Sequence, residues 1–312
     1  MKLDSLHLAQ IINRPLLFIL TVFMSLSLPA EMSNQIEAPA KTVAVPPSLV
    51  LSGLLELAFE ASDQAEDDTE LSLATLELAG HVDLTPRLEL DVLFAYEQDS
   101  DSLQFDTGVM TYQYEQQSSW TFSAGQEYLP FGAFFSYQVN DTLSLELAEI
   151  RGVFSGASYQ QAGFKAELYL YEEALGKHAN LGGRIGFHHD VFQIEMDVIE
   201  SVQDNPGLSV HGQIMLEKLV LIGEHLVIFN QADRVVGNRP SRVDQIELAY
   251  HFANIILAAA YQQSDVLDEF ELAKEKTSIT LSSDLNSAAH LGCEVARQDG
   301  NDSLTLLFSM AL

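Results

Sequence analysis

The sequence predicts an all-β protein, specifically a transmembrane antiparallel up-and-down β-barrel. Segments of about ten residues alternate between apolar and polar positions, tight turns join many of them, and the last such segment runs to the C-terminus. Beyond the N-terminus, no apolar run approaches the roughly 20 residues of a membrane helix. A chain of this kind can cross a membrane only as a closed barrel, in which every backbone group is paired.

The clearest hairpin covers residues 76–96, with its turn at Thr85–Arg87. Leucines, valines and aromatic residues share one face of each strand, because neighbouring side chains of a strand point in opposite directions. The charged residues on the other face are Glu77, Asp83, Glu89 and Asp91. This unit recurs along the chain, so the same two-faced pattern is expected throughout the barrel.

We expect about 16 strands, and the pattern is compatible with 14 to 18. The predicted strands are 52–60, 71–84, 87–97, 105–114, 119–129, 151–161, 163–171, 181–189, 191–200, 208–217, 219–229, 243–252, 255–263, 275–284, 286–297 and 303–312. Short turns alternate with longer polar connections, which are 61–70, 98–104, 130–150, 172–180, 201–207, 230–242, 264–274 and 298–302. Outer-membrane barrels show this alternation between short periplasmic turns and long extracellular loops.

The N-terminus predicts export. Lys2 and Arg14 precede the apolar run 16–24, and small residues follow near Ala30. A single-pass anchor is the alternative, but the apolar core is too short and Pro29 ends it. The expected organisation is a signal peptide at 1–30, a periplasmic lead-in at 31–50 and the barrel at 51–312, located in the bacterial outer membrane.

The C-terminal strand supports a closed barrel. Residues 303–312 alternate to the last position, and an uncovered terminal strand would leave an edge that invites aggregation. In a barrel this strand pairs with the first one. It is also the expected contact with the barrel-assembly machinery, although Leu312 departs from the usual aromatic last residue.

Charge excludes some partners and orients the sheet. The formal net charge of −30 excludes nucleic acid, which needs a basic surface. Acids alternate with leucines inside the strands, so we expect the polar face to line the interior and the apolar face to meet lipid and lipopolysaccharide. The single cysteine, Cys293, excludes an internal disulfide and falls in phase with the apolar face.

Candidate catalytic and metal-binding groups have a simpler explanation. His188, His189 and Asp190 lie at a predicted tight turn, where polar residues are solvated. His81, His211, His251 and His290 share the interior phase but lie on distant strands. No Gly-rich phosphate loop or metal-ligand spacing is present, so we predict no enzyme activity, no cofactor and no metal site.

The connection 130–150 is the longest and is the third extracellular loop. It carries Asp141, Glu146 and Glu149, and Arg151 follows it. One interpretation folds this loop into the lumen, where its acids face a basic stripe and create a transverse field. The other is a surface loop whose residues 143–147 extend a strand. The lumen or constriction candidates are Glu127, Asp141, Glu146, Glu149, Arg151, Lys165 and Arg184.

Three segments, 124–132, 141–149 and 161–169, resemble the LbtU family of siderophore porins, and weaker similarity covers most of the mature chain. They read Ala-Gly-Gln-Glu-Tyr-Leu-Pro-Phe-Gly, Asp-Thr-Leu-Ser-Leu-Glu-Leu-Ala-Glu and Gln-Ala-Gly-Phe-Lys-Ala-Glu-Leu-Tyr. The resemblance implies TonB-independent passage of a ferric siderophore through a barrel without a plug domain. It supplies no binding residues to transfer.

These observations lead to one functional expectation, a passive or substrate-selective pore for a ferric siderophore or small solutes. The alternatives are a general diffusion porin, an outer-membrane barrel enzyme, and a structural barrel whose lumen is filled by its own side chains. The carboxylates of the interior phase predict a preference for cations.

Overall fold

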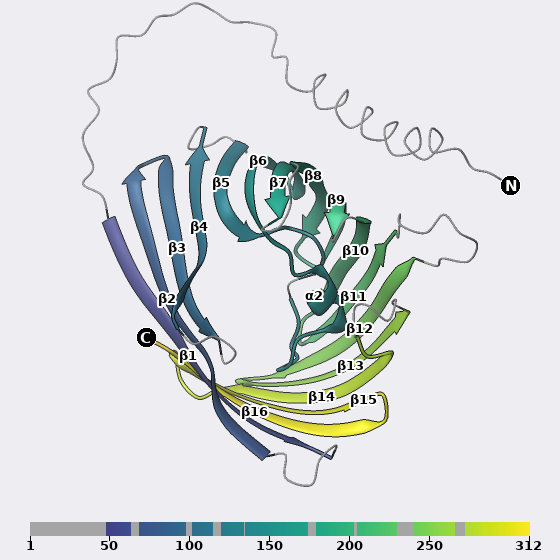
Figure 1. The fold of residues 1–312 in the computed structure, drawn as a ribbon. Helices are drawn as coiled ribbons and strands as arrows, with labels where there is room; N and C mark the ends of the chain where they lie inside the picture. Colours follow the sequence, from purple (N-terminus) through teal and green to yellow (C-terminus); the bar gives the residue numbers. More distant parts are fainter. Residues whose placement is uncertain are drawn as a thin grey trace, which may run out of the picture. The chain divides into compact units, whose positions relative to one another are not determined.

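The computed structural model describes residues 48–63, 69–97, 102–114, 120–133, 135–173, 179–202, 205–229, 240–265 and 272–312. In these residues 16 antiparallel strands close into one barrel, which confirms the predicted fold class and strand number (Figure 1). The predicted signal peptide lies outside the described residues, as does the lead-in up to residue 47. Within the described part, no helix is long and apolar enough to cross a membrane.

Each strand pairs with its neighbours in sequence, so the order around the barrel is the order along the chain. The strands are β1 (Ser48–Ser62), β2 (Thr69–Thr85), β3 (Leu88–Glu97), β4 (Gln104–Gln113), β5 (Trp120–Tyr128), β6 (Arg151–Gln161), β7 (Phe164–Glu173), β8 (Asn180–His189), β9 (Phe192–Val202), β10 (Asn205–Leu216), β11 (Leu219–Ile228), β12 (Ser241–Phe252), β13 (Ile255–Asp265), β14 (Glu275–Asp284), β15 (Ala289–Gln298) and β16 (Asn301–Ala311). One short helix, α2 (Leu143–Ala148), lies between β5 and β6.

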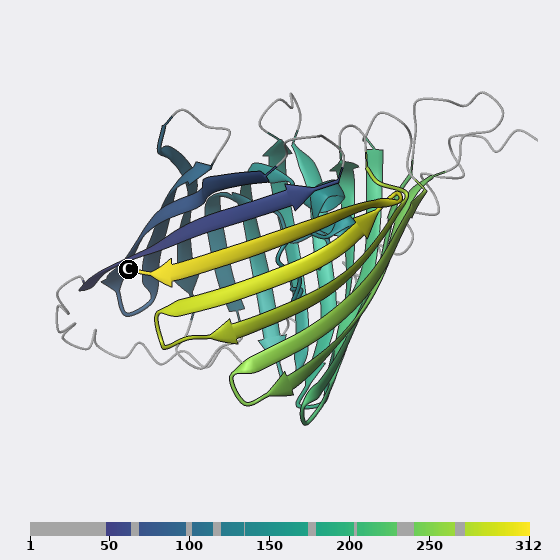
Figure 2. The same cartoon turned by 90° about the horizontal axis from the view of Figure 1, so that it is seen from below.

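The barrel closes where β1 meets β16 (Figure 2). Leu54 pairs with Ala311, and the register continues to Ser62 and Ser303. The backbone N–H of Leu312 donates to the carbonyl of Gly53 at 2.8 Å, so pairing reaches the last residue. The C-terminal strand therefore has a partner on both sides, as the alternation predicts.

The two faces of the sheet also agree with the prediction. On β9 and β12, Ile194, Ile246 and Leu248 point outward and are about half exposed, whereas Glu195 and Glu247 point inward and are buried. Since an apolar outer surface costs free energy in water, this distribution suits a barrel surrounded by lipid.

Two of the connections predicted to be long are short in the structure. Strands β9 and β10 continue further than expected, so the predicted loop 201–207 shrinks to residues 203–204, which are outside the described part. The predicted loop 298–302 is a tight turn, with Asp299 and Gly300 at φ 51° and 90°. Asp-Gly is a favoured pair for the type I′ turn of a hairpin, a local preference that the alternation ignores.

The inner wall of β10–β13 carries an apolar area that breaks the alternation. Val220, Ile222, Ala249 and Ala258 form a buried cluster on this wall. The sequence runs 219–222 and 255–260 are apolar at every position, so both faces of these strand segments are apolar. An apolar inner wall must be covered, and the loop between β5 and β6 covers it.

Candidate pore constriction

The segment between β5 and β6, residues 129–150, lies inside the barrel. Figure 1 shows α2 within the ring of strands. Leu129, Phe131, Leu143 and Leu147 are buried against inward-facing side chains of the wall, including Tyr169. Further along the segment, Phe135 and Tyr137 pack against the apolar area of β10–β13. We call this segment the inner loop.

The inner loop contains a helix where one interpretation of the sequence expects a strand extension. Thr142 caps α2, because its hydroxyl accepts a hydrogen bond from the backbone N–H of Leu145 at 3.1 Å. Leu143 and Leu147 are spaced by four residues and are both buried, as on one face of a helix. The apolar residues at 143, 145 and 147 fit a strand equally well, so the pattern alone cannot distinguish the two.

Buried carboxylates of the wall fix the start of the inner loop by accepting its backbone N–H groups. Gly132 donates to Asp197 of β9 and Ala133 donates to Glu224 of β11, each at 2.8 Å. Gly132 has φ 88°, a left-handed conformation that favours glycine. A Cβ there would lie 3.0 Å from Ala148 and 3.1 Å from the Glu224 carboxylate. Glycine therefore suits the entry of the loop into the lumen for two reasons, its left-handed backbone and the lack of room for a side chain.

The same arrangement continues along the wall. Tyr137 donates its N–H to Glu247 of β12 at 2.8 Å, and Val139 donates its N–H to Glu294 of β15 at 2.7 Å. The N–H of Leu143 donates to the side-chain oxygen of Gln262 on β13 at 2.6 Å. A carboxylate that accepts backbone N–H groups forms strong charge-assisted hydrogen bonds. These contacts hold the inner loop along the β9–β15 side of the lumen.

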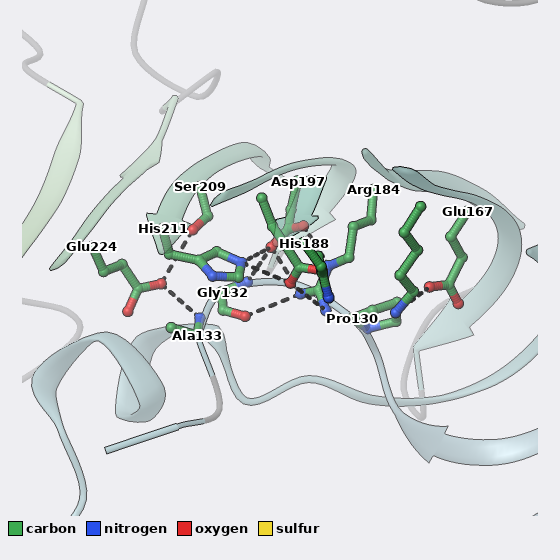
Figure 3. A network of polar contacts seen from close by, with 12 residues as sticks. Pro130, Gly132, Ala133, Glu167, Arg184, His188, Asp197, Ser209, His211 and Glu224 are labelled. Carbon is green, nitrogen blue, oxygen red and sulfur yellow. Dashed lines mark hydrogen bonds and ion pairs between the residues drawn. The ribbon is translucent and has the colours of Figure 1, made fainter. Parts of the chain in front are cut away.

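Asp197 is the centre of the polar network drawn in Figure 3. Its carboxylate accepts hydrogen bonds from Arg184 Nε at 2.6 Å and from Arg184 Nη2 at 2.9 Å, and His211 Nε2 lies 3.0 Å away. The same Nη2 also donates to the carbonyl of Gly132 at 3.1 Å. Arg184 therefore joins the wall to the inner loop, and its charge is balanced where it is buried.

A polar cavity of about 820 Å³ lies between the inner loop and the wall formed by β1, β2 and β14–β16. Its lining includes Glu60, Glu70, Asp141 and Glu146, together with Lys276. The ammonium group of Lys276 donates to the backbone carbonyl of Asp141 at 2.7 Å and lies 3.9 Å from Glu294. Among the described residues that line this cavity, the charged side chains are therefore four acids and Lys276, which is held by both the loop and the wall.

Glu146 is an acid of the inner loop whose electrostatic environment is perturbed. Desolvation raises the pKa of its carboxyl group above the ordinary value of 4.5. The charge of Lys276 opposes this rise, and the charge of Asp141 adds to it. Glu146 therefore takes up a proton at a higher pH than an ordinary glutamate.

The structure does not bring the predicted cations together as a basic stripe. Arg151 shares the face of Val153, which points outward and is 58% exposed, and it pairs with Asp106 at 2.8 Å. Lys165 faces inward but lies 3.8 Å from Glu167. Arg184 faces inward and is buried in the network around Asp197. Arg151 is the first residue of β6, and the alternation of that strand places it on the outward face with Val153.

The predicted acids are also divided. Asp141 and Glu146 lie on the inner loop and line the cavity. Glu149 follows α2, and its backbone N–H donates to Leu145. Glu127 lies on β5, on the face opposite the exposed Phe122, so it points inward.

Sequence reasoning missed the anchoring residues. Alternation places Asp197 and Glu247 in the interior, but it does not reveal that they bind the inner loop. Nor did it single out Glu224, Glu294 or Lys276. One feature of the sequence could have indicated them. Acids lie at inward positions of strands β9 to β15, and a long loop inside the barrel needs acceptors for its backbone N–H groups.

His188 and His189, which the sequence placed at a tight turn, are the last two residues of β8, and they do not form a cluster. His188 faces Glu195 at 2.8 Å, whereas His189 stacks on Phe192 with 5.5 Å between ring centroids. Neighbouring residues of a strand point to opposite faces, and here they do so as predicted.

Comparison with known proteins shows the fold. No family model and no curated protein matches the sequence. Among solved structures, Salmonella typhi OmpF in complex with daunomycin is similar, with TM-score 0.67 and 10% identity over 85% of this chain and 97% of that chain. A loop-deletion mutant of the Vibrio cholerae outer membrane protein OmpT has TM-score 0.64 and 12% identity over 85% and 99%. An anion-selective porin from Comamonas acidovorans has TM-score 0.60 and 12% identity over 86% and 100%. The chain shares with these outer-membrane proteins a closed antiparallel barrel, here of 16 strands.

Proposed function

We propose that this protein is an outer-membrane pore that lets small hydrophilic solutes pass and prefers cations. The observation that carries the proposal is the position of the inner loop, which narrows the lumen and leaves a polar cavity of about 820 Å³ beside it, with four acids and one lysine as its charged lining. A barrel with a purely structural role would have no need of such a cavity.

The charges of the lumen support cation preference. In the described strands, the inward-facing cations are Lys165, Arg184 and Lys276, and each lies within 4 Å of a carboxylate. Acids outnumber them on the inner face. Carboxylates without matching cations raise the local concentration of positive permeants and repel anions. Fold similarity cannot decide this point, since one of the similar barrels is described as anion-selective.

The narrower form of the proposal is TonB-independent passage of a ferric siderophore. It rests on the resemblance of segments 124–132, 141–149 and 161–169 to LbtU proteins. A ferric complex with carboxylate ligands is usually anionic, so the acidic lumen opposes it. The outward position of Arg151 removes one of the three cations that could attract it. A neutral or cationic ferric complex fits this lumen better.

The test is conductance of the purified barrel in planar bilayers. We expect discrete channels, with a reversal potential in a KCl gradient that shows K⁺ passing more readily than Cl⁻. Deleting residues 135–146 should increase conductance, because this segment occupies the lumen. A folded barrel without channels would favour a structural role, and an anion-selective one would contradict the charge argument.

The siderophore form needs a separate measurement in cells. A deletion strain under iron limitation should take up less labelled ferric siderophore than its parent, whereas uptake of an unrelated small solute reports general permeability. If uptake of the siderophore and of the unrelated solute both fall, the result supports a general pore. If only siderophore uptake falls, the result supports the narrower form. Hydrolase activity that disappears with His211→Ala would instead support a barrel enzyme.

A further inference from the structure

We propose that His81, Asp83 and Glu89 form a binding site for a divalent transition-metal ion on the lumen face of the β2–β3 hairpin. Their ligand atoms, one from each side chain, all lie within 4.8 Å of one another. Among the described residues, no other group of three or more His, Cys, Asp and Glu side chains brings its ligand atoms this close together. The inference does not depend on conduction through the barrel.

The β-register brings the three residues together. Asp83 pairs directly with Glu89, and His81 pairs directly with Asp91. All four lie on the face opposite the exposed leucines of β2, so they point into the barrel. Residues 81 and 83 are two apart on one strand, and 89 and 91 are two apart on the other. This spacing lacks the form of a metal motif on a single helix or loop, so the sequence pattern did not reveal it.

The imidazole is oriented as in a typical metal site. His81 Nδ1 lies 2.7 Å from the Asp91 carboxylate, which suits an N–H donated to that carboxylate. This hydrogen bond leaves Nε2 with its lone pair, 3.3 Å from Asp83 Oδ1. Metal-binding histidines generally donate their other ring N–H to a carboxylate or carbonyl group, which fixes the tautomer and increases basicity. Asp91 fills that supporting role here.

Asp83 is oriented in the same way. The hydroxyl of Ser48 on β1 donates to Asp83 Oδ2, and Oδ1 is left on the side of His81. Two of the three proposed ligands therefore have a supporting hydrogen bond, and their other ligand atoms, His81 Nε2 and Asp83 Oδ1, face each other at 3.3 Å, where a metal ion would replace their direct contact. Such a supporting shell separates a built site from a chance group of acids.

Charge provides an independent reason for a cation. Asp83 and Glu89 are carboxylates directly opposite each other on neighbouring strands, an arrangement that is destabilising for like charges. A divalent ion between them would remove this repulsion. One imidazole nitrogen with two carboxylate oxygens suits Zn²⁺, Mn²⁺ or Fe²⁺, and water can complete the coordination. Ca²⁺ and Mg²⁺ prefer oxygen ligands alone.

The experiment measures Zn²⁺ and Mn²⁺ binding to the folded full-length barrel in detergent, by titration calorimetry, in the presence of excess Ca²⁺. The Ca²⁺ occupies acids that attract any cation. We expect one site per chain that is lost in His81→Ala and in Glu89→Gln. Ser48→Ala and Asp91→Asn should weaken it by about 10- to 100-fold, as is usual for supporting residues.

His290→Ala is the matched control. His290 Nδ1 also lies close to an aspartate, Asp284, at 3.0 Å, but it belongs to no group of three ligands in the described residues. This variant should bind the metal as the unmodified protein does. Equal metal binding by His81→Ala and the unmodified barrel would overturn the site. So would a failure of the unmodified barrel to bind Zn²⁺ or Mn²⁺ when excess Ca²⁺ is present. A shift in electrophoretic mobility on heating shows that each variant is folded, and Glu89→Gln decides the question if His81→Ala does not fold.

Discussion

Asp197 illustrates how a single residue can hold two parts of this molecule together. Its carboxylate accepts hydrogen bonds from Arg184 and from the backbone of Gly132, with His211 beside it, and it has no exposed surface. Removing one partner of a buried ion pair leaves the other charge uncompensated. Asp197→Ala should therefore destabilise the folded barrel by about 3–5 kcal/mol, whereas Asp190→Ala in an exposed turn should change little. Thermal unfolding in detergent measures both, and equal stability of the two variants would contradict the network.

Glu146 is a second single residue with an expected effect on the whole pore, because it makes the pore sensitive to pH. Desolvation raises the pKa of Glu146 in the folded protein, so its protonated form stabilises the packed inner loop, and this contribution is complete below pH 4.5. The contribution is lost as the pH rises through the raised pKa. Cation preference changes in the opposite sense, since a protonated Glu146 carries no charge. On acidification the reversal potential should begin to fall at a higher pH than ordinary carboxylates explain. Glu146→Gln should remove this early part of the curve, and identical curves for both proteins would exclude the role.

At the scale of elements, α2 depends on tertiary contacts, because six residues are too few for a stable helix on their own. Leu147 is buried in the cluster that joins the inner loop to the wall. Leu147→Ala should cost about 2–5 kcal/mol of loop packing and give noisier channels with higher conductance. Leu285→Ala, in an exposed turn, is the control. Quiet channels of unchanged conductance from Leu147→Ala would show that α2 does not shape the pore.

The strands could be predicted from the sequence far better than the inner loop could. Alternation is a local signal, so it reveals that Ile194 faces outward and Glu195 inward without knowledge of any partner. The contact between Glu294 and Val139 joins residues 155 positions apart. Nothing local in either segment specifies that contact, and the same holds for the metal site, whose ligands meet only through the register of β2 and β3.

For the whole molecule, the decisive property is that the outer face is apolar. Ile194→Arg would place a charge among the outward-facing side chains, at a cost of about 2–4 kcal/mol if that position lies near the bilayer centre. Gln193→Arg makes the same change on the neighbouring inward position and should assemble normally. The fraction of heat-modifiable barrel in isolated outer membranes compares the two. Equal assembly would mean that the outer face does not meet lipid.

Backbone N–H groups of the inner loop, rather than its side chains, make many of the contacts with the wall. Every non-proline residue has such a group, so several positions of the loop are free to change their side chains without losing their place. In such a barrel, substitutions at exposed positions within 135–146 could change the selectivity of the pore while the wall stays the same. Grafting a loop sequence of equal length between Gly132 and Ala148 that keeps the buried Leu143 and Leu147 would then yield pores of new selectivity from the same barrel.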